Sequence, residues 1–211
     1  MKKLLLMAAF VLSTVGAFAQ YEKGDFTIQP KVGLNATSVS NFPVDKKWKA
    51  GFVGGVEAEY HFNHLLGLSF GALYSQQGTK LKLISNDNYA DYTSAHFDYI
   101  NIPVWVNFYV VKGLAVKVGL QPGFKVRDAI SYKGESMGWN KFCEATQFTG
   151  LKANTFDFSV PVGISYEYCN ICLDARYNIG CTKVFGGDNR DYDKTSNNQV
   201  FQLTLGYKFK L

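Results

Sequence analysis

The sequence predicts an all-β protein, an eight-stranded antiparallel up-and-down β-barrel. Three observations predict it. Apolar and polar residues alternate over stretches of about ten residues, which is the pattern of a strand with two different faces. Glycine (20 residues) and aromatic residues (16% of the chain) are plentiful, as is common in β proteins. Short and long connections between strands also alternate along the chain, as they do in a barrel whose neighbouring strands run in opposite directions.

The N-terminus is a predicted signal peptide, residues 1–19. Two lysines begin it, an apolar run follows over residues 4–12, and the small residues Ala17 and Ala19 precede the expected cleavage site. The apolar run is too short for a membrane-spanning helix, which needs about 20 residues. We therefore expect residues 20–211 to be exported and to form one domain.

The first predicted strand, Phe26–Ala36, sets the pattern for the others. Its even-numbered residues are apolar, including one proline, and its odd-numbered residues are polar or glycine. The same alternation predicts seven more strands, each longer than the five or six residues of an ordinary strand. They are Phe52–Phe62, Leu66–Gln76, Ile100–Val110, Leu114–Val126, Phe156–Tyr168, Ile171–Cys181 and Phe201–Leu211.

The connections define two different ends of the barrel. The short ones are "NHL", "VKG" and "CN". Since an even strand count returns both termini to the side of the short turns, that side is expected to be periplasmic and the long loops extracellular. The long loops are expected at residues 37–50, 77–98, 127–155 and 182–199.

The charged residues within the strands all lie on the polar side of the alternation. A soluble barrel with an apolar interior, such as a lipocalin, and a membrane barrel with an apolar exterior could both show this. The membrane barrel is favoured because the apolar face ends in aromatic residues and because the polar face is rich in glycine and serine, which suits a narrow lumen. The charged residues are Lys31, Glu57, Glu59, Lys117, Lys125, Asp157, Glu167, Asp174, Arg176 and Lys208.

These ten residues divide into five cations and five anions, so the predicted interior is neutral. Eight strands enclose a space that side chains nearly fill, and ions removed from water need partners. We expect a plug of ion pairs, with Lys125 near Asp157 and Lys117 near Glu167. The alternative is that the ten residues are simply solvated in the lumen.

Four segments resemble a known family. They are "LYSQQGTK", "YINIPVWVNFYVVKGLAVKVGLQPGF", "LDARYNIGCTKVF" and "FQLTLGYKFKL". In this order they are similar to the PorT-like small outer-membrane β-barrel proteins, often labelled "porin family". The resemblance implies an eight-stranded barrel in a Gram-negative outer membrane, and one member type supports protein secretion. The last segment fits a barrel-assembly signal, although it ends in Leu211 rather than in an aromatic residue.

Residues for catalysis or metal binding are sparse. The three histidines, His61, His64 and His96, have no cysteine or carboxylate cluster beside them, so no metal site and no cofactor are expected. The exported location permits disulfides. The sequence allows one between Cys169 and Cys172 and another between Cys143 and Cys181, with packing residues or free thiols as the alternative.

The predicted function is that of a structural or binding protein, or a secretion accessory, acting through its extracellular loops. A narrow pore for small solutes is the alternative, and a lipid-acting enzyme is a weaker one because the apolar face carries no histidine or acid. The expected partners are membrane lipid and lipopolysaccharide, the barrel-assembly machinery at the last strand, and an unidentified surface partner. Without Lys2 and Lys3 of the predicted signal peptide, the formal net charge falls from +5 to +3, which is too small to indicate nucleic acid.

Overall fold

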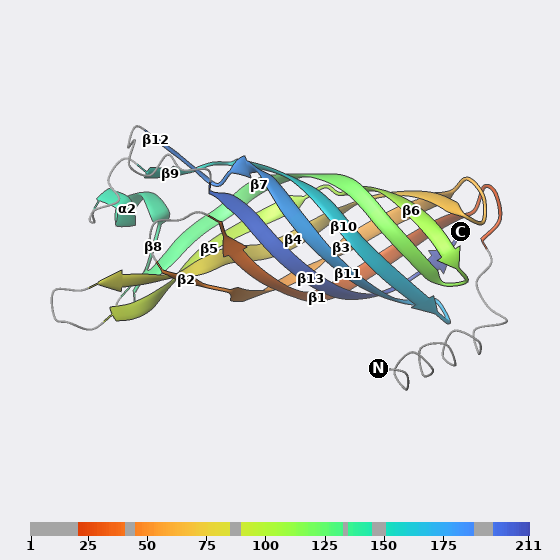
Figure 1. Cartoon of the computed structure of the whole chain (residues 1–211), viewed down its shortest axis with the longest axis horizontal. Helices are drawn as coiled ribbons and strands as arrows, with labels where there is room; N and C mark the ends of the chain where they lie inside the picture. Colours follow the sequence, from red (N-terminus) through yellow and green to blue (C-terminus); the bar gives the residue numbers. More distant parts are fainter. Residues whose placement is uncertain (1–20, 41–44, 85–89, 133–134, 145–150, 188–195) are drawn as a thin grey trace, which may run out of the picture.

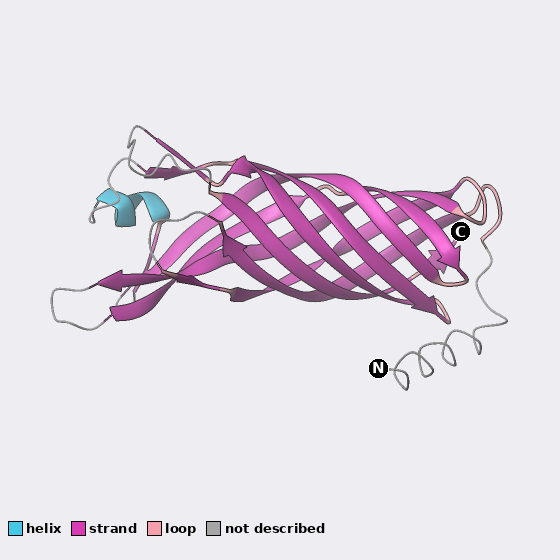
Figure 2. Ribbon diagram, in the orientation of Figure 1, coloured by secondary structure: helices cyan, strands magenta, loops and turns pink. Residues whose placement is uncertain are grey.

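The computed structural model describes residues 21–40, 45–84, 90–132, 135–144, 151–187 and 196–211. The predicted signal peptide, 1–19, lies outside the described residues and stays a prediction. The described chain is almost entirely strand and forms a closed barrel (Figure 2). The long strands are β1 (Phe26–Val39), β3 (Lys49–His61), β4 (Leu66–Ile84), β5 (Ala90–Asn101), β6 (Val104–Val111), β7 (Leu114–Tyr132), β10 (Phe156–Tyr168), β11 (Ile171–Lys183) and β13 (Asn197–Tyr207).

The wall of the barrel has eight antiparallel positions in chain order, as predicted. We call each position a stave, and a stave is either one strand or two consecutive strand segments. Strands β5 and β6 form one stave, interrupted at Ile102 and Pro103, because a proline cannot donate to the ladder. Strand β14 (Phe209–Lys210) continues β13. The first and last staves close the barrel, with Leu34 opposite Leu203 and Lys31 opposite Gly206.

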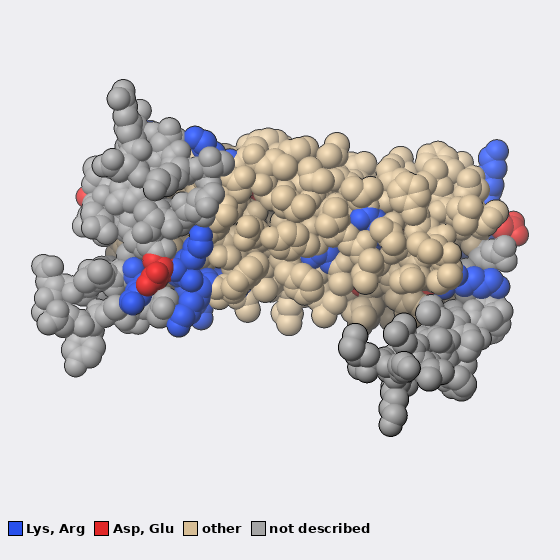
Figure 3. Space-filling model, viewed as in Figure 1, with Lys and Arg blue, Asp and Glu red and all other residues tan. Residues whose placement is uncertain are grey.

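The two faces of the barrel follow the predicted alternation. Val32, Leu34 and Leu205 are 55%, 67% and 53% exposed, whereas the intervening Lys31 and Gln202 are 2% and 1% exposed. On the face shown in the space-filling view, a belt of almost entirely uncharged surface covers the middle of the molecule, with only small parts of Lys or Arg side chains visible in it (Figure 3). Polar groups therefore fill the interior, and apolar side chains face outward over the width of a bilayer.

The last stave also turns its predicted face outward. Leu203, Leu205, Tyr207, Phe209 and Leu211 are all exposed. Recognition of this stave by the barrel-assembly machinery stays a prediction.

The predicted loops 77–98 and 127–155 are wrong in extent, because β4, β5 and β7 continue well into them. In these extensions most apolar residues occupy inward positions and most charged residues occupy outward ones. Leu81, Phe97 and Ile130 point inward and are at most 1% exposed, while Arg127 points outward. This reversal of the two faces marks the point where the wall leaves lipid and enters water, and apolar residues then gain by facing the interior.

The remaining elements gather at this extended end (Figure 1). Strand β2 (Lys46–Lys47) pairs with β4, and β8 (Glu135–Met137) pairs with β7. Strand β9 (Leu151–Ala153) pairs with β12 (Phe185–Gly187), and between β8 and β9 lies the helix α2 (Trp139–Glu144). None of the described helices is long and apolar enough to cross a membrane.

Helix α2 supplies an apolar cap, which we call the aromatic cap. Trp139 and Phe142 are fully buried among the inward residues of the extended strands. The Trp139 ring stacks on Phe185 at 5.0 Å and meets the edge of Phe97 at 5.3 Å. Burial of two large aromatic side chains contributes about 1.5–3 kcal/mol each, so the cap is a small hydrophobic core of its own.

Candidate functional site

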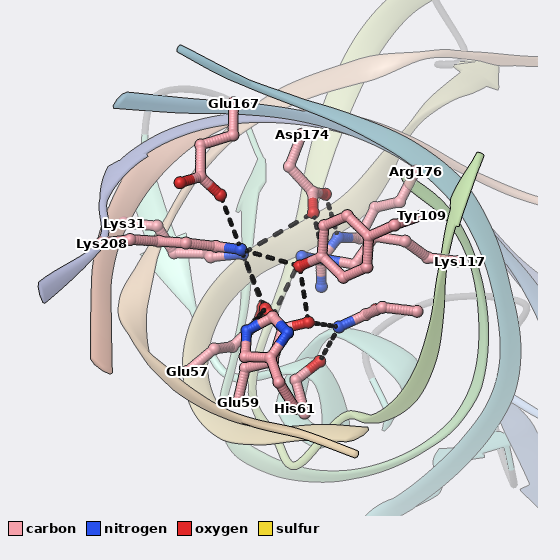
Figure 4. A network of polar contacts seen from close by, with 12 residues as sticks. Lys31, Glu57, Glu59, His61, Tyr109, Lys117, Glu167, Asp174, Arg176 and Lys208 are labelled. Carbon is pink, nitrogen blue, oxygen red and sulfur yellow. Dashed lines mark hydrogen bonds and ion pairs between the residues drawn. The ribbon is translucent and has the colours of Figure 1, made fainter. Parts of the chain in front are cut away.

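The lumen holds a cluster of five charged side chains, which we call the central ion layer (Figure 4). Lys31 Nζ lies 2.6 Å from Glu57 Oε2 and 3.7 Å from Asp174 Oδ2. Lys117 Nζ donates to Asp174 Oδ2 at 2.7 Å. Arg176 joins both acids, with Nη2 3.0 Å from Glu57 and Nε 2.9 Å from Asp174. Each carboxylate therefore has several cationic partners, which offsets the cost of removing these ions from water.

Strand register and residue size make room for this layer. Gly71 lies opposite Glu57, and a Cβ at that glycine would come 2.6 Å from Glu57 Cγ. The fully buried Trp105 covers the cations on another side. Its ring lies 4.6 Å from Arg176 Cζ and 5.4 Å from Lys117 Nζ, a cation–π arrangement. The layer is thus fixed by β1, β3, β6, β7 and β11 together.

A second cluster, the periplasmic layer, lies toward the short turns. Lys208 Nζ bridges Glu59 Oε2 at 2.9 Å and Glu167 Oε2 at 3.0 Å. Asn107 and Tyr109 donate to Glu59 Oε1 at 2.6 and 2.7 Å. This layer has one lysine for two carboxylates, and hydrogen bonds satisfy the remaining oxygens.

The chain before β1 completes the periplasmic layer. Tyr21 donates to Glu167 Oε1 at 2.6 Å, and its ring stacks on His61 with 3.8 Å between centroids. Gly24 N donates to His61 O, so the segment is tied to the end of β3. Sequence reasoning missed Tyr21, because nothing in the period-two pattern places a residue outside the strands.

Both ion pairs that the sequence predicts are wrong. Lys117 lies opposite Gly163 and reaches Asp174, while Glu167 pairs with Lys208. Lys125 Nζ lies 2.7 Å from Asp128 instead. The observed register of β7 and β10 differs from the register that either predicted pair requires. In addition, Gly163 of β10 leaves room for the Lys117 side chain to reach across that strand to Asp174 of β11.

Asp157, the remaining predicted charge, accepts a hydrogen bond from Thr182 at 3.0 Å. Another buried cation at the extracellular end, Lys49, was not predicted because the predicted strand began at Phe52. Lys49 Nζ donates to the carbonyl of Gln77 at 3.1 Å. The continuation of β3 to Lys49 was hidden by the loss of alternation at Lys49–Gly51.

Between the central ion layer and the aromatic cap lie five carboxamides, which we call the amide layer. They come from five different strands and are each at most 3% exposed. Several of their polar atoms have no protein partner. The layer consists of Asn35, Asn101, Gln121, Asn178 and Gln202.

Neither disulfide that the sequence allows is formed. Cys172 points into the lumen, whereas its proposed partner Cys169 is exposed in the turn. Cys181 lies on the outer face, and Cys143 is buried in the aromatic cap, where burial raises the pKa of its thiol to about 11. In each pair, one cysteine is buried and the other is exposed.

His61 is buried and His64 is exposed in the next turn, so these two do not converge. Among the residues that the structure describes, no group of three or more histidine, cysteine or acidic side chains is arranged to hold a metal ion.

The comparisons agree with this architecture. Residues 18–186 match the family model described as "Outer membrane protein beta-barrel domain", which is well over half of the chain. The chain belongs to this family. No curated protein matches it. The protein is therefore a small β-barrel of the outer membrane.

Solved outer membrane barrels share the fold. Neisserial surface protein A (NspA) is 18% identical, with 88% of this chain and 97% of NspA covered and a TM-score of 0.50. OprG from Pseudomonas aeruginosa is 14% identical, with 90% and 97% covered and a TM-score of 0.49. Ail of Yersinia pestis is 15% identical, with 89% and 99% covered and a TM-score of 0.42. Of these three, NspA alone reaches a TM-score of 0.50, and at 18% identity that likeness shows the fold alone.

Proposed function

We propose that this outer membrane barrel acts as a binding protein at the cell surface and that its lumen passes no solute. The observation that supports the proposal is the filling of the lumen at successive levels. The periplasmic layer, the central ion layer and the aromatic cap each place large, buried side chains across a barrel of eight strands. Such a barrel is only just wide enough for side chains to begin with.

Single-channel recording in planar bilayers tests this proposal. The wild-type barrel is expected to give no steady openings, and Lys117→Ala is expected to give none either, since the other levels stay filled. Steady wild-type openings whose size changes in Lys117→Ala would favour the alternative, a narrow pore for small solutes.

The extracellular end offers a surface for lipopolysaccharide. Cations gather directly beyond the apolar belt (Figure 3). We call Lys80, Lys82, Arg127 and Lys152 the basic collar. Arg127 and Lys82 have side chains 65% and 37% exposed. Their position suits the phosphate groups of lipopolysaccharide in the outer leaflet, because cations form charge-assisted hydrogen bonds with phosphate oxygens.

Thermal unfolding with and without added lipopolysaccharide tests this contact. We expect lipopolysaccharide to raise the unfolding midpoint of the wild type, and the double variant Lys80→Gln/Arg127→Gln to lose most of that rise. Lys112→Gln removes an exposed cation from a turn at the opposite end and is the matched control. An equal rise in all three proteins would exclude the collar as the binding surface.

A role in protein export is the specific form of this function that the PorT-like resemblance supports. A deletion strain is expected to retain exported proteins in the periplasm, and complementation should require the extracellular segments but not Lys117. Normal export in the deletion strain would leave surface binding without the export role.

We also propose that the protein is not an enzyme. Support comes from the exposed residues of the apolar belt that the structure describes, which include no histidine, aspartate or glutamate; Asp98, at an outward position of β5, is only 2% exposed and accepts a hydrogen bond from Tyr74. A lipid-acting enzyme needs such a base next to its substrate. Release of acyl chains from purified lipid A by the wild-type protein would overturn this.

A further inference from the structure

The central ion layer, taken by itself, carries one positive charge in excess, whereas the periplasmic layer, in which Lys208 faces both Glu59 and Glu167, carries one negative charge in excess. The central ion layer has three cations, Lys31, Lys117 and Arg176, and only two carboxylates, those of Glu57 and Asp174. All five residues are at most 5% exposed. Water therefore does not screen these charges as it would at a surface. The excess cation is offset only by a carboxylate of the other layer, so an anionic partner within the central ion layer would stabilise it further.

Arg176 is the cation with unused capacity. Its Nε donates to Asp174 and its Nη2 to Glu57, but its Nη1 has no protein partner and is buried. The other described lumen acids are engaged at other levels. Glu59 and Glu167 are held by Lys208, and Asp157 accepts from Thr182 near the extracellular end.

The amide layer places further donors beside Arg176. Gln202 lies directly across from Arg176 in the β11–β13 register, and Asn178 is the next residue of β11 on the same face. Both side chains are at most 2% exposed, and the amide nitrogen and oxygen of each have no protein partner. A carboxamide can turn to present its NH₂ group, so Gln202 and Asn178, which the strand register places beside Arg176, can offer N–H donors next to the unpaired N–H of its guanidinium.

We propose that Arg176, Gln202 and Asn178 bind a small monovalent anion, such as chloride, inside the barrel. One negative charge equalises the central ion layer, and N–H donors are the groups that an anion requires. The central ion layer on one side and the aromatic cap on the other restrict the site to small ions. This site does not depend on the proposed surface function.

Bromide is the probe for the site. In crystals grown with sodium bromide, anomalous scattering should place bromide within hydrogen-bonding distance of Arg176 Nη1. Refolded protein should also show a higher thermal unfolding midpoint in sodium chloride than in sodium gluconate of equal ionic strength, because a ligand that binds only the folded state stabilises it and gluconate is too large to enter.

Three variants separate the site from general salt effects. Arg176→Gln should lose the chloride dependence. Gln202→Glu, a nearly isosteric change, should also lose it, because the new carboxylate supplies the missing charge and keeps the protein foldable if Arg176→Gln does not fold. Lys125→Gln removes a lumen cation paired elsewhere and should keep the dependence. Unchanged chloride dependence in Gln202→Glu, or water with no bromide beside Arg176 Nη1, would overturn the proposal.

Discussion

At the scale of single residues, burial decides how much each ion pair contributes. The side chains of Lys31 and Glu57 are 0% and 2% exposed, whereas those of Lys125 and Asp128 are 11% and 29% exposed. Breaking a buried pair leaves an ion that water cannot reach, while a partly exposed pair is easily replaced by hydration. The same chemistry therefore has different consequences at different depths of one lumen.

Glu57→Gln is expected to lower the free energy of unfolding by about 3–5 kcal/mol, because the remaining cations of the central ion layer then share one carboxylate. The measurement is equilibrium unfolding of the refolded barrel in denaturant. Asp128→Asn, the matched change at the outer pair, is expected to cost about 1 kcal/mol or less. Equal losses in the two variants would contradict the assignment of the central layer as the stabilising one.

Asp25, just before β1, provides a pH test outside the membrane-spanning strands. Its carboxylate pairs with Lys210 at 2.6 Å and accepts from the amide of Glu22, and these two hydrogen bonds hold its pKa below the ordinary value. A lowered folded-state pKa contributes stability above the unfolded value of about 3.9 that is lost as the pH falls through the folded value.

Lys210→Gln is therefore expected to raise the pKa of Asp25 toward the ordinary value, as followed by NMR of the carboxyl carbon. Lys23→Gln, a neighbouring exposed lysine, should leave the titration unchanged. A titration of Asp25 that is the same with and without Lys210 would show that the ion pair does not form in solution.

At the scale of elements, the aromatic cap is a separate unit from the ion layers. Its residues come from α2, from the extended ends of β1, β4, β5 and β7, and from β12 with the preceding Val184. Its stability depends on apolar burial rather than on charge. Loss of the cap should therefore weaken the extracellular end while the ion layers hold the middle of the barrel closed.

Trp139→Ala is expected to cost about 3–5 kcal/mol of unfolding free energy, since it leaves a cavity among Phe97, Phe142 and Phe185. Trp48→Ala removes the same side chain from a position that is 51% exposed and should change stability by about 0.5 kcal/mol or less. Planar-bilayer recordings of Trp139→Ala should still lack steady openings. Steady openings in this variant would mean that the cap, not the ion layers, closes the barrel.

The elements also show what the sequence could predict. The strands and their two faces were predictable because period-two alternation is a local signal, visible in Phe26–Ala36 alone. The partner of Lys117 was not, since it depends on register and on the space beside Gly163. The inward position of Leu81 was missed because the inner face of a membrane barrel was expected to be polar throughout. In the part of the wall outside the membrane, apolar residues face the interior instead.

At the scale of the whole molecule, the apolar exterior fixes the position in the membrane. The outward series on the last stave runs through Phe201, Leu203, Leu205, Tyr207 and Phe209. Leu205 is the middle member and lies beside Val32 and Leu173 of the adjacent strands. Val126, in contrast, lies at the edge of the belt, next to the exposed Arg127.

This placement predicts how a charge on the outer face affects folding into lipid vesicles. Leu205→Arg should cost about 2–4 kcal/mol, since an arginine near the bilayer midplane loses its hydration, whereas Val126→Arg should cost about 1 kcal/mol or less near the interface. Denaturant titration of vesicle-folded protein measures both. A small cost at Leu205 with a large one at Val126 would move the membrane toward the extracellular end, and small costs at both would mean that the belt does not face hydrocarbon.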